Sequence, residues 1–133
     1  MLVVKIDDIV KSCDIQYQIT ARKVLDQMKS LKCRGSYQEY FPHLPLDGNT
    51  SPVVRQHIGG VLLGIWTWCM TKSDHLMPML PMLIQLKGQE IAGEGMQRWY
   101  IDIFGTLENY DFFCKNYAEY AEKQLQSGVL VLE

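Results

Sequence analysis

The sequence predicts a mainly α-helical single domain, a multi-helix bundle around a buried central helix spanning residues 52–72. Two observations favour this class: apolar residues recur at spacings of three and four through most of the chain, and residues 52–72 hold its longest run of large apolar side chains. At 133 residues the chain is close to the usual size of one domain, so we expect residues 1–133 to form one unit. Apolar residues at both termini also allow a small sheet between the chain ends.

Residues 6–31 are expected to form one helix, or two helices with a break near Cys13 and Asp14, because apolar residues keep a helical spacing there. The alternation of Ile15, Tyr17 and Ile19 is the opposing clue for a strand. The segment 22–34 is rich in lysine and arginine, which suits a helix C-terminus. Contact with nucleic acid is the alternative, but no nucleic-acid motif accompanies the cluster, so we expect none.

Gly35 is a candidate cap for this helix, and residues 36–41 are expected to add one short turn. The stretch 42–51 contains prolines and an Asp-Gly pair, which predicts a surface loop. The aromatic residues just before it, Tyr37, Tyr40 and Phe41, are therefore predicted to form the rim of a binding site at the loop.

The central helix should begin at Pro52, because Ser51 before it suits an N-cap and proline suits the first helical position. The residues of this helix are apolar on nearly all of its faces, so we expect other elements to cover it and bury it. Its uninterrupted apolar part, Ile58–Met70, has 13 residues, against about 20 for a membrane span. Gly60 and Gly64 predict close helix packing, with a homodimer seam as the alternative; a strand over residues 60–69 is the alternative to the helix itself.

Two prolines, Pro78 and Pro81, prevent a continuous helix after the central one, and the methionines around them are expected to fill the core. Residues 96–104 have helical spacing, with an edge strand as the alternative. Thr106 is the expected N-cap of a helix over residues 107–127, which Gly128 ends. The apolar tail, residues 129–133, should dock on the body or on a partner.

No motif of a metal, nucleotide or acyl-transfer site occurs, so we predict no catalytic residue, no metal site and no cofactor. Cys33 lies between Lys32 and Arg34, which should lower the pKa of its thiol. The four cysteines are widely spaced, which favours free thiols, and the first ten residues lack the apolar run of a secretory signal. We therefore expect a cytoplasmic protein. An enzyme or ligand-binding domain centred on His57 or His75 is an alternative hypothesis.

Charge is distributed unevenly. Residues 1–88 contain 10 lysines and arginines against 7 aspartates and glutamates, whereas residues 89–133 contain 3 against 8. An acidic half of this kind attracts a basic partner. The hypothesis is a small protein-binding protein, an inhibitor or immunity protein that neutralises a basic partner such as a nuclease toxin; a self-associating adaptor is the alternative. The predicted partner-binding residues are Glu90, Glu94, Asp102, Glu108, Asp111 and Glu119, together with Tyr37 and Tyr40.

Overall fold

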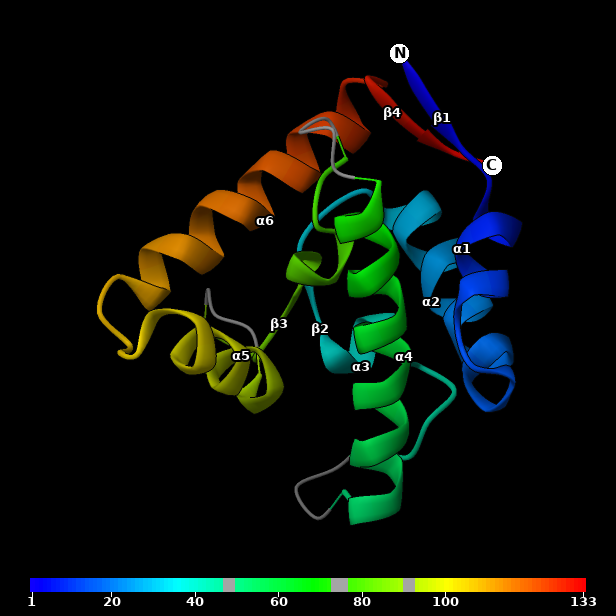
Figure 1. Cartoon of the computed structure of the whole chain (residues 1–133). Coiled ribbons are helices and arrows are strands. Elements are labelled where there is room, and N and C mark those ends of the chain that lie inside the picture. The colour runs from blue at the N-terminus through cyan, green and yellow to red at the C-terminus, as the bar shows by residue number, and fades with distance from the viewer. Residues whose placement is uncertain (47–49, 73–76, 90–92) are drawn as a thin grey trace.

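Helices make up most of the chain in the computed structural model, which describes residues 1–46, 50–72, 77–89 and 93–133 (Figure 1). The mainly helical class is therefore confirmed. The α-helices are α1 (Ile6–Ser12), α2 (Gln18–Leu31), α3 (Tyr37–Tyr40), α4 (Pro52–Thr71), α5 (Glu94–Phe104) and α6 (Tyr110–Gln126), and the 3₁₀ helices are η1 (Ile15–Tyr17) and η2 (Leu80–Leu83). None of the described helices is both long and apolar enough to cross a membrane.

Two short parallel sheets tie distant parts of the chain together. β1 (Leu2–Val4) pairs with β4 (Leu130–Leu132), which confirms the sheet predicted for the two chain ends and the docking of the apolar tail. β2 (Gly35–Ser36) pairs with β3 (Ile84–Gln85), a pairing that the sequence did not indicate. Gly35 is therefore a strand residue, and the left-handed residue that closes α2 is Lys32, with φ of 53°.

The N-terminal helices pack against α4 as the sequence predicts. The chain breaks at Cys13 between α1 and η1, and the strand alternative for residues 15–19 is wrong because they lie in η1 and α2. α4 starts at Pro52, where the Ser51 hydroxyl accepts the backbone N–H of Val54 at 3.3 Å. It is a helix throughout, so the strand alternative for residues 60–69 is also wrong.

The glycines of α4 serve internal packing. A Cβ atom at Gly64 would lie 2.8 Å from the Sγ atom of Cys13, and one at Gly60 would overlap the ring of Tyr17. Both glycines therefore face η1 and the end of α1, and close packing between helices is confirmed as their role. The same faces are not open for a homodimer seam.

The expectation that α4 is buried on all sides is wrong. Val53, Leu63 and Met70 are exposed, because α1, α2 and η1 cover one side of α4 and η2 covers another. The C-terminal helix α6 packs on η2, which lies between α6 and α4 (Figure 1). Residues 77–85 are all buried, so three of the methionines, Met77, Met79 and Met82, fill the core as predicted.

Two helices, α5 and α6, precede the C-terminal strand β4. α5 confirms the helical prediction for residues 96–104 over the edge strand. α6 begins at Tyr110, three residues later than predicted, because Asn109 before it takes a left-handed conformation with φ of 64°. The prediction of Thr106 as the N-cap is therefore wrong, because Asn109 occupies that position; the Thr106 hydroxyl instead accepts the backbone N–H of Glu108 in the turn before α6. Gly128, with φ of 76°, follows the end of α6 as expected.

Candidate interaction surface

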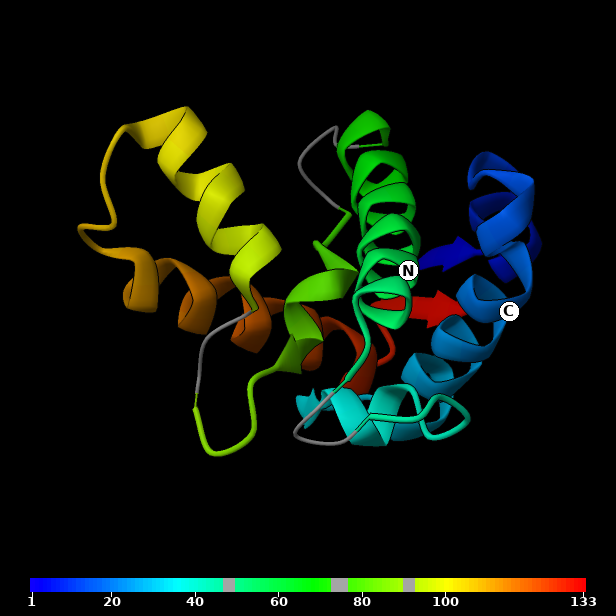
Figure 2. The ribbon, with the colours of Figure 1, turned by 90° about the horizontal axis from the view of Figure 1, so that it is seen from below.

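The α5–α6 hairpin lies at the opposite side of the molecule from α1 (Figure 2). Aromatic rings attach it to the body and join its two helices. The ring of Trp99 in α5 lies edge-on to Trp66 in α4, with centroids 5.0 Å apart. Tyr100 contacts the rings of Tyr110 and Phe113 in α6, each at 5.2 Å. These contacts position α5 by its inner face.

The turn between the two helices is held by hydrogen bonds. The hydroxyl of Tyr100 donates to the backbone carbonyl of Glu108 at 2.7 Å, and the N–H of Glu108 donates to the hydroxyl of Thr106 at 3.1 Å. Gly105 closes α5 in a left-handed conformation, and its N–H donates to the carbonyl of Ile101. The turn therefore has a defined shape before any partner arrives.

Large apolar side chains are exposed around this turn. We define the hairpin tip as residues 101–112. Ile103 lies four residues after Trp99 and seven after Met96, so it shares the face of α5 that packs inward nearer the body, yet it is 59% exposed. The apolar face of α5 thus continues beyond the core that covers it. The exposed apolar residues of the hairpin tip are Ile101, Ile103, Phe104, Leu107 and Phe112.

The hairpin tip is also acidic. Asp102, Glu108 and Asp111 are exposed, and no ion pair in the described part of the chain involves them. Residues 99–114 contain no lysine or arginine. Three of the predicted partner-binding residues therefore lie on one hairpin tip, together with apolar residues that the sequence analysis did not select. The run Ile103–Phe104–Gly105–Thr106–Leu107 was the available signal, because it places large apolar residues at a turn.

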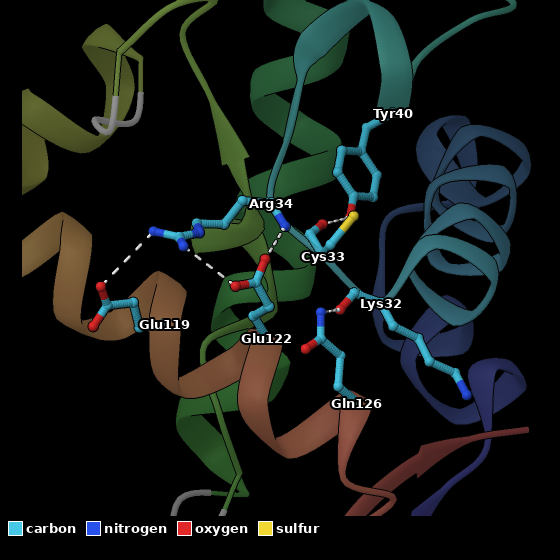
Figure 3. Close-up of polar contacts among 7 residues, drawn as sticks. All are labelled: Lys32, Cys33, Arg34, Tyr40, Glu119, Glu122 and Gln126. Carbon is cyan, nitrogen blue, oxygen red and sulfur yellow. Dashed lines mark hydrogen bonds and ion pairs between the residues drawn. The ribbon is translucent and has the colours of Figure 1, made fainter.

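Glu119 has a different environment from the hairpin tip. It belongs to a row on α6, with Glu122 and Gln126, that faces the segment between α2 and β2 (Figure 3). The guanidinium of Arg34 lies 3.3 Å from Glu122 and 4.0 Å from Glu119. Glu122 also accepts the backbone N–H of Arg34, and Gln126 donates to the carbonyl of Lys32. This row fixes α6 to the segment that leads into β2.

The predicted aromatic rim does not form at the surface. Tyr40 and Phe41 are fully buried, and the Tyr40 hydroxyl donates to the carbonyl of Cys33 (Figure 3). Tyr37 is half-buried and stacks on Phe41, with centroids 6.2 Å apart, and burial raises the pKa of its hydroxyl. These rings support α3 from inside. Of the other predicted residues, Glu90 lies outside the described residues, and only the backbone of Glu94, the first residue of α5, is described.

The pKa of the Cys33 thiol is raised, whereas the sequence predicted that it is lowered. Burial, followed by the carboxylates of Glu122 and Glu39, raises its pKa, and these effects outweigh the guanidinium of Arg34. All four cysteines are free, as expected. Burial raises the pKa of Cys69 to about 12, so this thiol is also protonated at neutral pH.

Of the two histidines in the alternative hypothesis, the structure describes His57. Nε2 of His57 lies 2.7 Å from the hydroxyl of Thr20, and its ring lies edge-on to Tyr17 at 5.3 Å. His75 lies outside the described residues. Within the described ranges, no three histidine, cysteine, aspartate or glutamate side chains are grouped so as to hold a metal ion.

A shallow pocket of about 240 Å³ lies beside β2 and β3. Its walls include Arg34 and Lys87 as well as Glu39, so it presents both signs of charge. The guanidinium of Arg34 is already held by Glu122. The hairpin tip instead combines charge of one sign with exposed apolar side chains.

Comparison with protein-family models, with curated proteins and with solved structures finds no match to this chain. The molecule is therefore described from its own fold and surface: it is a small helical protein whose helical hairpin exposes acidic and apolar side chains at its tip.

Proposed function

We propose that this chain binds a basic protein partner through the hairpin tip and acts without catalysis of its own. The observation that carries the proposal is the presence, within the hairpin tip, of five exposed apolar side chains and of three carboxylates that form no ion pair among the described residues. Exposed apolar surface rimmed by polar groups is typical of protein interaction sites. Carboxylates beside it would speed the approach of a cationic partner and disfavour partners of the wrong charge.

The charge of the hairpin tip argues for a protein rather than a nucleic acid. Affinity for nucleic acid depends on lysine and arginine that neutralise phosphates, and residues 99–114 have neither. Anionic membrane surfaces would be repelled for the same reason. A self-associating adaptor is also less favoured, because three carboxylates would approach their own copies in a symmetric contact at the tip.

Within this class, we propose an inhibitor or immunity protein that neutralises a basic partner such as a nuclease toxin. A nuclease must present cationic surface to hold phosphates. An acidic protein of 133 residues that covers such a surface would block the substrate directly. The hydrogen-bonded turn supports this role, because a surface already in its bound shape loses less conformational entropy on association.

Affinity capture with a triple charge-neutral variant tests the proposal. The variant combines Asp102→Asn, Glu108→Gln and Asp111→Asn. A matched control combines Asp8→Asn, Asp14→Asn and Asp26→Asn, which changes net charge equally at exposed positions of the other half. Each protein is used to capture partners from the source-cell lysate at low and high salt, and each captured protein is identified and quantified.

The wild-type chain and the control should capture the same basic protein at low salt. The hairpin variant should bind that protein about tenfold more weakly, since three exposed carboxylates at roughly 0.5 kcal/mol each contribute about 1.5 kcal/mol. Binding by the wild-type chain should weaken between about 50 and about 300 mM salt, because screening shortens the reach of charges to less than about 10 Å. Equal capture by all three proteins, with the same salt dependence, would contradict the proposal.

A further inference from the structure

The most exposed aromatic side chain of the hairpin tip has no ring or cation of the described residues against it. Phe112 is 68% exposed, and none of the ring contacts in the described part of the chain involves it. Lys115 lies one turn further along α6, but the cation–ring contact that the described residues show is elsewhere, between Lys72 and Trp68. The Phe112 ring is therefore accessible to a partner.

Carboxylates lie close to this ring in the chain. Asp111 directly precedes Phe112 in the first turn of α6, and Glu108 lies in the turn whose shape the hydroxyls of Tyr100 and Thr106 fix. Phe104 lies two residues after Asp102 in α5; it is 53% exposed and its ring contacts Tyr100. Aromatic rings and acceptor oxygens are thus interleaved on both arms of the hairpin tip.

An exposed aromatic ring beside a carboxylate can distinguish an arginine side chain from a lysine side chain. A guanidinium is planar and weakly hydrated, so it can stack on a phenyl ring while its N–H groups donate to a carboxylate. A lysine ammonium is a compact and strongly hydrated charge, and it gains less from a ring at the surface. An acidic surface without aromatic rings would attract both side chains and would lack the ring contact that favours arginine.

We propose that the hairpin tip selects arginine over lysine, with a partner guanidinium stacked on Phe112 and hydrogen-bonded to the carboxylate of Asp111 or Glu108. This inference rests on the proposed function, because it specifies the chemistry of the same partner. It commits the partner to an arginine-bearing protein segment.

Two peptides test the inference without knowledge of the natural partner. Both have the same length and the same apolar residues; one carries five arginines and the other five lysines. Their affinities for the whole chain are measured by fluorescence anisotropy at low salt. The proteins compared are the wild-type chain, Phe112→Leu and the triple neutral variant of the hairpin tip. Leucine retains apolar bulk at an exposed position, so Phe112→Leu should keep the fold, as checked by circular dichroism.

The wild-type chain should bind the arginine peptide about threefold more tightly than the lysine peptide, as expected for a cation–ring contact at an exposed site. Phe112→Leu should bring the two affinities together, whereas the triple neutral variant should weaken both peptides. Equal affinities in the wild-type chain, or a preference for arginine that survives Phe112→Leu, would overturn the inference and leave the proposed function standing. Affinities of both peptides that are unchanged in the triple neutral variant would instead count against the proposed function.

Discussion

The α1–α4 body and the α5–α6 hairpin are both helical and both rich in apolar residues, yet they use those residues in opposite ways. Ile65 in α4 is fully buried, whereas Ile103 in α5 is 59% exposed. In the body, helices approach closely because Gly64 lies directly against Cys13. In the hairpin, helices are positioned by ring contacts and one face extends past the core. The recognition that we propose therefore belongs to the end of the hairpin that the core does not cover, whereas α6 also contributes Cys114, Ala121 and Leu125 to that core.

The largest expected difference between the two regions comes from one substitution made in each. Ile65→Ala should lower the free energy of unfolding by about 2–5 kcal/mol, because it removes buried methyl groups and leaves a cavity. Ile103→Ala should change it by less than about 0.5 kcal/mol, as is usual for exposed positions. Urea denaturation followed by circular dichroism measures both values.

Similar losses from the two variants would contradict the comparison, because they would mean that Ile103 is buried in solution. Partner capture supplies the complementary readout. Ile103→Ala should weaken capture while the fold remains, whereas folded Ile65→Ala should bind as the wild-type chain does.

A second pair of substitutions sharpens the comparison within α4 itself. An added Cβ at Gly59 would meet no atom within 4 Å, so Gly59→Ala should stabilise the protein by about 0.5–1 kcal/mol through helix propensity alone. At Gly64 the same gain in helix propensity should be smaller than the cost of the overlap with buried Cys13, since overpacking costs about 1–3 kcal/mol. Opposite signs of the change in melting temperature are the expected result.

If Gly64→Ala also raised the melting temperature, the close approach of α1 to α4 would not exist in solution. Cys13→Ala provides a control, because it removes the sulfur that the new methyl group meets. The double variant Cys13→Ala/Gly64→Ala should recover part of the loss seen in Gly64→Ala.

Some features with a local cause were predictable from the sequence. Ser51 and Pro52 start α4 as expected, and Gly128 follows the end of α6, because caps and left-handed positions depend on neighbouring residues. The helical spacing in residues 96–104 likewise distinguished α5 from a strand.

Features that depend on distant contacts were not predictable. The two-residue strands β2 and β3 are too short for any periodic signal, and their pairing joins segments about fifty residues apart in the sequence. Tyr40 lies before a loop, where a surface position was a reasonable expectation, but the fold places it in the core.

For the candidate site, charge alone selected the half of the chain that contains the hairpin tip. Asp102, Glu108 and Asp111 lie together at the hairpin tip, whereas Glu119 faces Arg34 across a contact between residues 85 positions apart. Periodicity also identified the apolar face of α5, but it does not indicate where along the helix the core stops covering that face. Exposure of Ile103 and Phe104 is a property of the tertiary arrangement, so only the structure reveals it.

The smallest expected effect concerns the contact that fixes α6 to the body. The carboxylate of Glu122 contributes to the raised pKa of Cys33, after burial, and it also holds the guanidinium of Arg34. Glu122→Gln should therefore lower the pKa of the Cys33 thiol, while the new amide oxygen can still accept the N–H of Arg34. A lower pKa increases the thiolate fraction at any pH below it, so Cys33 should react faster with Ellman's reagent at mildly alkaline pH.

Glu119→Gln is the matched control for this experiment, because Glu119 lies near the same guanidinium but does not contribute to the pKa of Cys33. The other three thiols are buried and should react slowly in every variant, which leaves Cys33 as the fast phase. Equal acceleration by Glu119→Gln would show that loosening of Arg34, rather than loss of the Glu122 charge, controls the thiol. Acceleration by Glu122→Gln alone would show that α6 lies close enough to place its carboxylate against Cys33. The C-terminal end of α6 would then belong to the body, and its N-terminal end would belong to the hairpin tip.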